Sequence, residues 1–250
     1  MRLFEVVMLF FVGIAAGTMN TIVGSGGLVT FPALLAFGYT PFVANMTNNV
    51  GVMPGALSGA YAFRSELRTQ WPRVMRLSAL SLAGGLAGAL LLLALPSKAF
   101  NAIVPVLIGL SLVLVIIQPR LRKRAAQRGG ISRRHALFHR VALFLTGVYG
   151  GYFGAAQGVL LMSILGAMFD ETIQKLNSIK IILALWANTA AAIVFIIHGG
   201  IAWEAAGLIA VGSIIGGQLG GHIGRRLPEP VYRGVIVAFG IAAIVKLLSS

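Results

Sequence analysis

Two glycine-rich segments are the parts of this 250-residue chain best suited to hold a ligand. They are the stretch from Asn20 to Gly27 and the stretch from Gly150 to Gly158. Glycine tolerates positive φ angles, which allow successive backbone N–H groups to be exposed. A helix that begins at such a turn carries about half a positive charge at its N-terminus, which favours an anion. The segments therefore predict noncovalent anion binding. The alternative is close helix packing, for which membrane proteins also use small residues.

Amide side chains and one lysine accompany these segments. Lys180 is the only charged residue between Asn177 and His198, and a buried unpaired ammonium costs about 2.5–3.5 kcal/mol even on the gentlest scale. Two interpretations remain open: Lys180 pairs with a bound anion, or its long side chain extends to the nearby helix end. The candidate substrate-binding residues are Asn20, Gly24, Ser25, Gly26, Gly27, Asn45, Thr47, Asn48, Gly154, Gln157, Gly158, Asn177, Lys180 and Asn188.

Other kinds of chemistry lack the residues they need. The six acidic residues all fall near the ends of apolar segments, whereas proton and cation pathways use carboxylates at depth. His135 and His139 are four residues apart but have no accompanying carboxylate. The chain has no cysteine, and it carries no nucleotide-binding, nucleophile or zinc motif. We therefore expect an anion as cargo, no catalytic residues, no metal and no cofactor.

The composition places these segments in a membrane. Hydrophobic residues make up 58% of the chain and charged residues 10%, against about 25% charged in soluble domains. The mean hydropathy is +0.90. Residues 6–63 contain no Asp, Glu, Lys or Arg, and later uncharged runs approach the roughly 20 residues that a membrane-spanning helix needs. The fold class we predict is an all-α polytopic membrane protein, with the N-terminal apolar run retained rather than cleaved.

The second half of the chain repeats the first. A shift of 132 positions aligns Trp71 with Trp203, Gly84-Gly85 with Gly216-Gly217, and Leu95-Pro96 with Leu227-Pro228. Upstream, a shift of about 130 aligns Gly17 with Gly147 and Gly24 with Gly154. We predict a first transmembrane repeat at 1–117, a basic cytoplasmic linker at 118–138 and a second repeat at 139–250.

Loop charges orient the two repeats in opposite directions. The loop with Arg64, Arg68, Arg73 and Arg76 is basic, whereas its mate at 198–203 contains no Lys or Arg. Because basic loops stay in the cytoplasm, the repeats have inverted topology, a common transporter design. Residues 120–140 contain eight Lys or Arg and no acid. We interpret this central loop as a topology anchor that touches anionic lipid, and we expect no nucleic-acid partner.

Each repeat is expected to contain a Gly-broken helical hairpin and three long helices. The long helices are predicted at 43–63, 74–95, 98–117, 173–197, 203–224 and 231–248. The hairpins, 4–38 and 139–169, end in the short apolar runs Leu28–Phe37 and Val159–Met168. Ten helical residues reach only about 15 Å, half the thickness of the hydrocarbon layer. We therefore expect the two breaks to meet near the membrane centre, and we leave open whether eight or ten crossings result.

The chain resembles the sulfite exporter TauE/SafE family in several short stretches. The matching pieces are Gly17-Thr18-Met19-Asn20, Gly24 to Pro32, Ala44 to Asn49, Tyr149 to Gly154, and Asn177 to Lys180. The resemblance implies a bacterial inner-membrane permease for sulfite, sulfoacetate and related organosulfonates. One departure is that residues 154–158 are less glycine-rich than the first-half segment, so the two loops need not contribute equally. The amide of Gln157 is then a candidate donor to an oxyanion.

The functional hypothesis is an exporter of small sulfur-containing anions, with sulfite as the first candidate. The alternatives are an exporter of sulfoacetate, another organosulfonate or a small carboxylate, a passive anion channel, and a membrane scaffold that transports nothing. The expected partners are the anionic substrate and membrane lipid, and association of two copies is left open.

Overall fold

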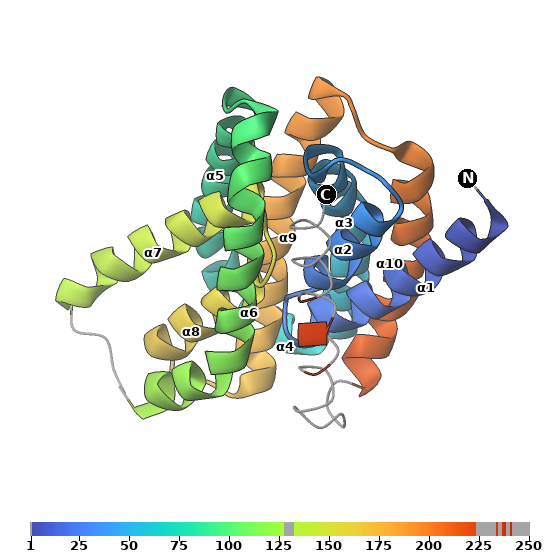
Figure 1. The fold of residues 1–250 in the computed structure, drawn as a ribbon. Coiled ribbons are helices and arrows are strands. Elements are labelled where there is room, and N and C mark those ends of the chain that lie inside the picture. The colour runs from blue at the N-terminus through green and yellow to red at the C-terminus, as the bar shows by residue number, and fades with distance from the viewer. Residues whose placement is uncertain (1, 128–132, 224–233, 235–236, 239–240, 242–250) are drawn as a thin grey trace.

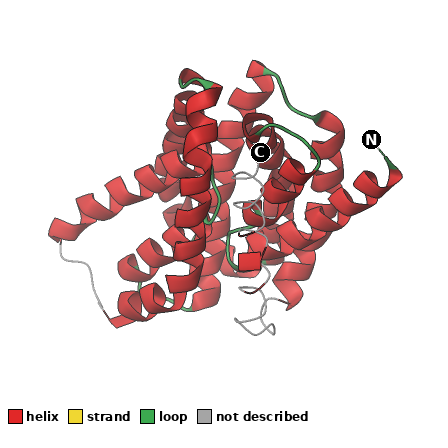
Figure 2. Cartoon of the chain, viewed as in Figure 1, coloured by secondary structure: helices red, strands yellow, loops and turns green. Residues whose placement is uncertain are grey.

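The computed structural model describes residues 2–127 and 133–223, together with residues 234, 237, 238 and 241. The described part is helical, with short connecting loops (Figures 1 and 2). The helices are α1 (Leu3–Ile22), α2 (Gly27–Ala36), α3 (Pro41–Ala62), α4 (Arg64–Arg68), α5 (Trp71–Ala94), α6 (Ser97–Gln127), α7 (Arg133–Tyr152), α8 (Gln157–Met168), α9 (Ile173–His198) and α10 (Trp203–Ile223). The predicted all-α fold is confirmed. The predicted helix at 231–248 lies almost wholly outside the described residues.

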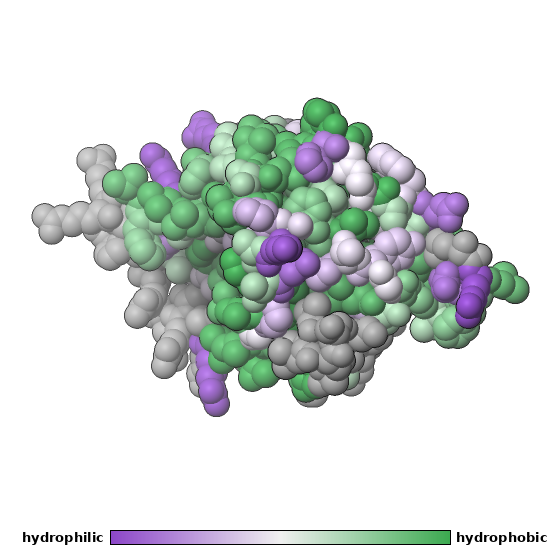
Figure 3. Space-filling view, turned by 45° about the horizontal axis from the view of Figure 1, so that its top comes forward, coloured by the Kyte–Doolittle hydropathy of each residue, from purple (hydrophilic) through white to green (hydrophobic). Residues whose placement is uncertain are grey.

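Five of the described helices are long and apolar enough to cross a membrane: α1, α5, α9, α10 and the Ser97–Ile117 part of α6. The exterior agrees with this assignment, because large hydrophobic side chains such as Phe11, Leu90 and Val106 are exposed. Figure 3 shows hydrophobic residues over much of the face in view, with hydrophilic ones in separate groups. In water such a surface would associate, so lipid is its natural surrounding.

The two short helices begin after matching breaks. α1 ends where Gly24 adopts a φ of 81°, and α7 ends where Gly154 adopts a φ of 75°. In both breaks the last two amides share one carbonyl acceptor, Met19 in the first and Tyr149 in the second. A left-handed glycine is a common helix stop. The predicted short helices are therefore present, as α2 and α8, within two residues of their expected starts.

Two helix boundaries beside the predicted linker were predicted wrongly. We expected the third long helix to end at residue 117, but α6 continues to Gln127. The added residues are mainly Leu, Arg, Lys, Ala and Gln, which are good helix formers regardless of charge. α7 likewise starts at Arg133, inside the predicted linker. The division of the chain into two repeats and a linker stays a prediction.

Glycine contacts between helices follow the same pattern in both halves. A Cβ atom added at Gly84 would lie 2.3 Å from the carbonyl oxygen of Phe144, and one at Gly216 would lie 2.0 Å from that of Ile14. The neighbouring Gly85 meets Ala187 in the same way, and Gly217 meets Gly55. A shift of 132 residues relates Gly84 to Gly216 and Ala187 to Gly55, and a shift of 130 residues relates Phe144 to Ile14. The glycines of α5 and α10 thus serve close packing. α5 lies against α7 and α9, while α10 lies against α1 and α3.

The helix directions follow from these contacts. Along α3 and α10, Thr47 pairs with Ala202, Gly51 with Ser213, and Ser58 with Gln218, so these two helices run parallel. α9 and α10 are joined by a short turn and run in opposite directions (Figure 1). α3 and its sequence mate α9 are therefore antiparallel. This arrangement supports the predicted inverted repeat, whose orientation in the membrane stays a prediction.

Candidate functional site

The two helix breaks touch each other through their backbones. The amide of Gly158 donates to the carbonyl oxygen of Gly24 at 3.0 Å. A Cβ atom added at either glycine would lie 2.4 Å from the Cα of the other. Only two residues without side chains can pack at this distance. The crossing therefore joins the start of α8 to the end of α1, as expected from the paired glycine-rich segments.

Lys180 of α9 lies beside this crossing and has no exposed surface. Its ammonium donates to the carbonyl oxygens of Thr21 at 3.2 Å and of Asn20 and Ile22 at 3.4 Å. These carbonyls form the last turn of α1, where the helix dipole is negative. Among the described residues no carboxylate forms an ion pair with Lys180. The side chain is buried against the end of α1 and does not extend to the end of its own helix, α9, so the second interpretation of this lysine is wrong for this conformation.

A small cavity separates Lys180 from the first break. It is lined by Asn20, Thr21 and Gly24 on one side and by Ala56, Lys180, Ile181 and Ala184 on the other. Its volume of about 10 Å³ available to water centres is roughly what a single water requires. A sulfite ion is larger than a water molecule. The structure is therefore closed around this point, and an anion needs the surrounding helices to move apart.

Two buried oxygens near the cavity, Thr21 Oγ1 and Asn177 Oδ1, have no hydrogen-bond partner among the described residues. The Asn177 amide nitrogen itself donates to the Thr21 carbonyl at 3.1 Å. Buried polar atoms in folded proteins nearly always have a partner. These two atoms are thus available to a small polar ligand held next to an ammonium.

The start of α2 offers a further set of donors. The Ser25 hydroxyl is buried and has no partner among the described residues. The backbone amides of Ser25, Gly26 and Gly27 likewise donate to no other described residue. Gly27 faces the Asn48 side chain, whose oxygen accepts a hydrogen bond from the Thr30 hydroxyl. Ser25, Gly27 and Asn48 therefore form a polar group at the N-terminus of a short helix.

Other predicted site residues stabilise the fold in this conformation. Asn45 donates to the Tyr152 carbonyl at 2.9 Å, which caps the end of α7 much as Asn177 caps α1. Asn188 meets Asn49 at 3.5 Å, and its side-chain oxygen lies near Gly154. Thr47 accepts from the amide of Ala202 and so faces α10. Gln157 packs on Gly150 and donates to the carbonyl of Thr146, away from the cavity.

The structure adds residues that sequence reasoning missed. The Tyr149 and Ser111 hydroxyls both donate to the Ala155 carbonyl, at 2.5 and 3.1 Å, and so support the second break. Thr21 was also missed, although it lies beside Asn20 in the same segment. Ser111 is an isolated serine in an apolar helix, and no spacing connects it to the break.

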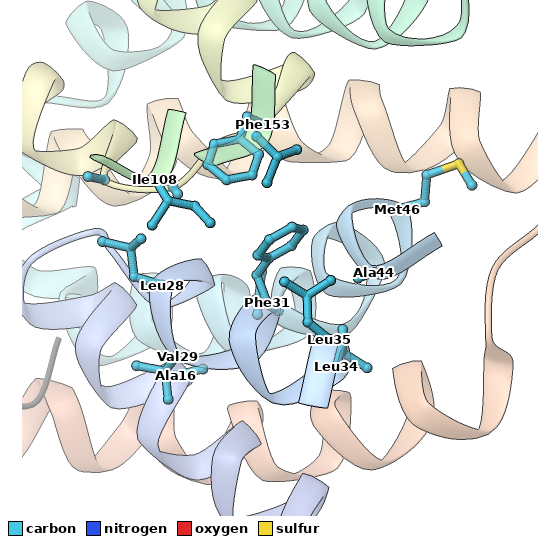
Figure 4. Packing of buried hydrophobic residues seen from close by; sticks show 14 of the residues in the cluster. Ala16, Leu28, Val29, Phe31, Leu34, Leu35, Ala44, Met46, Ile108 and Phe153 are labelled. Carbon is cyan, nitrogen blue, oxygen red and sulfur yellow. The ribbon is translucent and has the colours of Figure 1, made fainter. Parts of the chain in front are cut away.

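An aromatic cluster covers the crossing from another direction. Phe31 of α2 and Phe153 of the second break meet edge to face, with ring centroids 5.3 Å apart (Figure 4). Phe100 contacts Phe42 and Tyr152 edge to face and Phe153 in a tilted arrangement. The crossing is thus polar toward Lys180 and apolar toward these rings. Among the described residues no group of His, Cys, Asp or Glu could hold a metal ion.

Comparisons with known proteins assign a family. The sequence profile described as "Sulfite exporter TauE/SafE" matches residues 9–247. The chain is 27% identical over 243 residues to the probable membrane transporter protein YfcA of Escherichia coli K12, covering 96% of this chain and 88% of that protein. It is 25% identical over 241 residues to a probable membrane transporter protein of Haemophilus influenzae, covering 96% and 93%. A match at 26% to the probable membrane transporter protein MamO of Magnetospirillum gryphiswaldense spans 95% of this chain and 43% of MamO.

Proposed function

Because the chain belongs to the sulfite exporter TauE/SafE family, we propose that it carries small sulfur-containing anions, with sulfite as the first candidate, out of the cytoplasm. It is a multi-pass helical membrane protein of a transporter family. The bacterial inner membrane is the proposed location, with the basic loop between α6 and α7 in the cytoplasm. Transporter families of this kind are not expected to catalyse a covalent reaction.

The observation that carries the proposal is the buried ammonium of Lys180 beside the crossing of the two breaks. An anion placed in an enlarged cavity would replace the α1 carbonyls as the partner of this ammonium. The Thr21 hydroxyl would donate a further hydrogen bond, and the free amides at the start of α2 lie on the same segment. Because the site is shielded from water, each of these attractions is stronger than at an exposed site.

The closed cavity implies that transport requires a rearrangement. An anion that takes Lys180 away from Asn20, Thr21 and Ile22 releases the end of α1, so binding and helix movement are coupled. Export of an anion from a negative interior is downhill by about 2.3 kcal/mol per charge per 100 mV. A coupling ion is therefore not required for outward transport.

The test uses purified protein in liposomes loaded with sulfite, under an imposed membrane potential. We expect Lys180→Met to weaken sulfite binding at least roughly tenfold, since one charge-assisted hydrogen bond is worth about 1.5–3 kcal/mol. Lys180→Arg should retain part of the binding, and Lys98→Met, which removes an exposed lysine, should change nothing. Unchanged sulfite affinity in a folded Lys180→Met protein would overturn the proposed site.

Parallel measurements separate the substrate and the mode of transport. Sulfite, sulfate, acetate and sulfoacetate are compared at equal concentration in the same liposomes. We expect sulfite flux to be fastest and to saturate. Faster sulfoacetate or acetate flux would reassign the substrate, and sulfite flux that stays linear with concentration would indicate a channel rather than a carrier.

A further inference from the structure

A second pocket, of about 830 Å³, lies at the end of the molecule where α5 and α9 begin. The first turns of α5 form one wall, and Arg140 of α7 forms another. The turn between α8 and α9 closes the pocket. The helices come from both halves of the chain, so anything bound here would bridge the two halves. In Figure 1, α7 slants away from α8 on this side of the molecule.

Positive charge predominates in this pocket. Arg73, Arg76, Arg140 and Lys175 line it together with a single acid, Glu171. Glu171 accepts from Arg73 at 3.2 Å and from Lys175 at 3.0 Å. Arg76 and Arg140 form no ion pair or hydrogen bond with any described residue. Two guanidinium groups are thus free, in a setting that suits the bidentate recognition of phosphate.

Apolar residues continue the pocket toward the middle of the helices. Leu77 and Leu80 line it from α5, the latter one turn or about 6 Å beyond Arg76. On α7, Val141 and Leu145 follow Arg140 and are about half exposed. Trp71, also about half exposed, precedes the arginines on α5, as expected for a residue at the membrane interface. Cations therefore lie at headgroup level, and a hydrocarbon surface begins directly beyond them.

We propose that this pocket binds the phosphate of an anionic phospholipid, with Arg76 and Arg140 as its ligands and the acyl chains along Leu77 and Leu80. Basic pockets between membrane helices are typical sites for such headgroups. The pocket is separate from the cavity at Lys180, because Lys175 and Lys180 point about 140° apart around α9. The lipid is thus a structural ligand that ties α5 to α7 and α9, and it is not the transported anion.

The test compares the Arg76→Gln/Arg140→Gln protein with the Arg64→Gln/Arg68→Gln protein. The second variant loses the same charge from the nearby α4 segment but leaves the pocket intact. Thermal unfolding is followed in an uncharged detergent during titration with phosphatidylglycerol or phosphatidylcholine. We expect phosphatidylglycerol, but not phosphatidylcholine, to raise the Tm of the parent and of the Arg64/Arg68 control. The Arg76/Arg140 variant should need roughly tenfold or more phosphatidylglycerol for the same rise.

Two outcomes would overturn the proposal. Equal phosphatidylglycerol dependence in both double variants would show that the pocket does not hold the headgroup. An equal rise in Tm with inorganic phosphate or glycerol phosphate would show a site for soluble anions rather than for lipid. Sulfite transport by the Arg76/Arg140 variant is measured alongside, because unchanged sulfite affinity would agree with a lipid site separate from Lys180.

Discussion

At the scale of single residues, the buried charge of Lys180 is the main energetic constraint on the candidate site. Burying an ammonium is costly, and here the three carbonyl oxygens at the end of α1 offset that cost. The same residue is thus a structural cap and, within the described part of the chain, the only cation beside the crossing. An anion that binds Lys180 must compete with the helix end. Because of this competition, an anion that binds Lys180 would also change the contacts that hold the end of α1.

The Ser25 hydroxyl provides a prediction in which stability and function change in opposite directions. It is buried and finds no partner in the part of the chain that the structure describes, and such a group costs about 1–3 kcal/mol. We expect Ser25→Ala to leave the Tm unchanged or to raise it, because the unpaired hydroxyl is removed. If Ser25 contacts the anion, the same change should raise the KM for sulfite several-fold. Both quantities are measured on one preparation, in detergent and in liposomes.

Ser163→Ala is the matched control on α8. The Ser163 hydroxyl donates to the Val159 carbonyl of its own helix at 2.9 Å, so its loss should change neither Tm nor KM by much. A drop in Tm for Ser25→Ala with unaltered transport would instead assign Ser25 to packing alone.

Some site residues were predictable from local spacing and others were not. Asn20, Gly24 and Lys180, which line the small cavity, could be predicted as candidates because they lie in or beside segments whose composition is unusual for an apolar chain. Thr47 precedes Asn48 directly, but neighbours on a helix point about 100° apart, so Thr47 faces α10 instead. Which face meets which helix depends on tertiary packing. The orientation of the Gln157 side chain, whose amide nitrogen donates to the Thr146 carbonyl, was equally hidden in the sequence.

At the scale of helices, the breaks were predictable because glycine both stops a helix and permits close approach. The importance of this close approach can be measured at Gly158, since a Cβ atom there would lie 2.4 Å from the Cα of Gly24. We expect Gly158→Ala to lower stability by about 1–3 kcal/mol through overpacking and to reduce transport. Thermal unfolding and sulfite flux are the measurements.

Gly109 supplies the matched control for that substitution. It also lies within a helix, but nothing is within 4 Å of an added Cβ. Gly109→Ala should therefore be neutral or stabilise the protein by about 0.5–1 kcal/mol. Equal effects of the two substitutions would mean that the contact between the breaks has no special importance.

Glu171, outside the apolar segments, adds a polar link between the starts of α5 and α9. Its hydrogen bond from Lys175, and then that from Arg73, hold the pKa of this carboxyl below the ordinary value for glutamate. The stabilisation is therefore complete above the ordinary pKa and is lost as the pH falls through the lower folded value. Because the group is partly exposed, we expect an effect of at most about 1 kcal/mol.

The measurement is Tm against pH for the parent and for Glu171→Gln. The variant should have a slightly lower Tm than the parent at neutral pH. This difference in Tm should disappear in acid and shrink with added salt. A difference that persists at low pH would show that the carboxylate charge is not responsible.

At the scale of the whole molecule, the two halves are interleaved rather than placed side by side. α10 of the second half lies against α1 and α3 of the first, and α5 of the first half lies against α7 and α9 of the second. Neither half can bury its glycine-lined faces alone. Any rocking motion would therefore involve the group α1, α3 and α10 against the group α5, α7 and α9. This differs from the movement of two sequence halves that the repeat suggests.

The orientation of the repeat gives the last prediction. The chain has no cysteine, so Ser65→Cys and His198→Cys each introduce a single reporter at an exposed position in equivalent loops. α3 and α9 are antiparallel, and only the loop of Ser65 is rich in arginine. In intact cells a membrane-impermeant maleimide should label His198→Cys alone, and permeabilised cells should label both. Because antiparallel mates that cross the membrane must end on opposite sides, labelling of both cysteines in intact cells would exclude inverted topology.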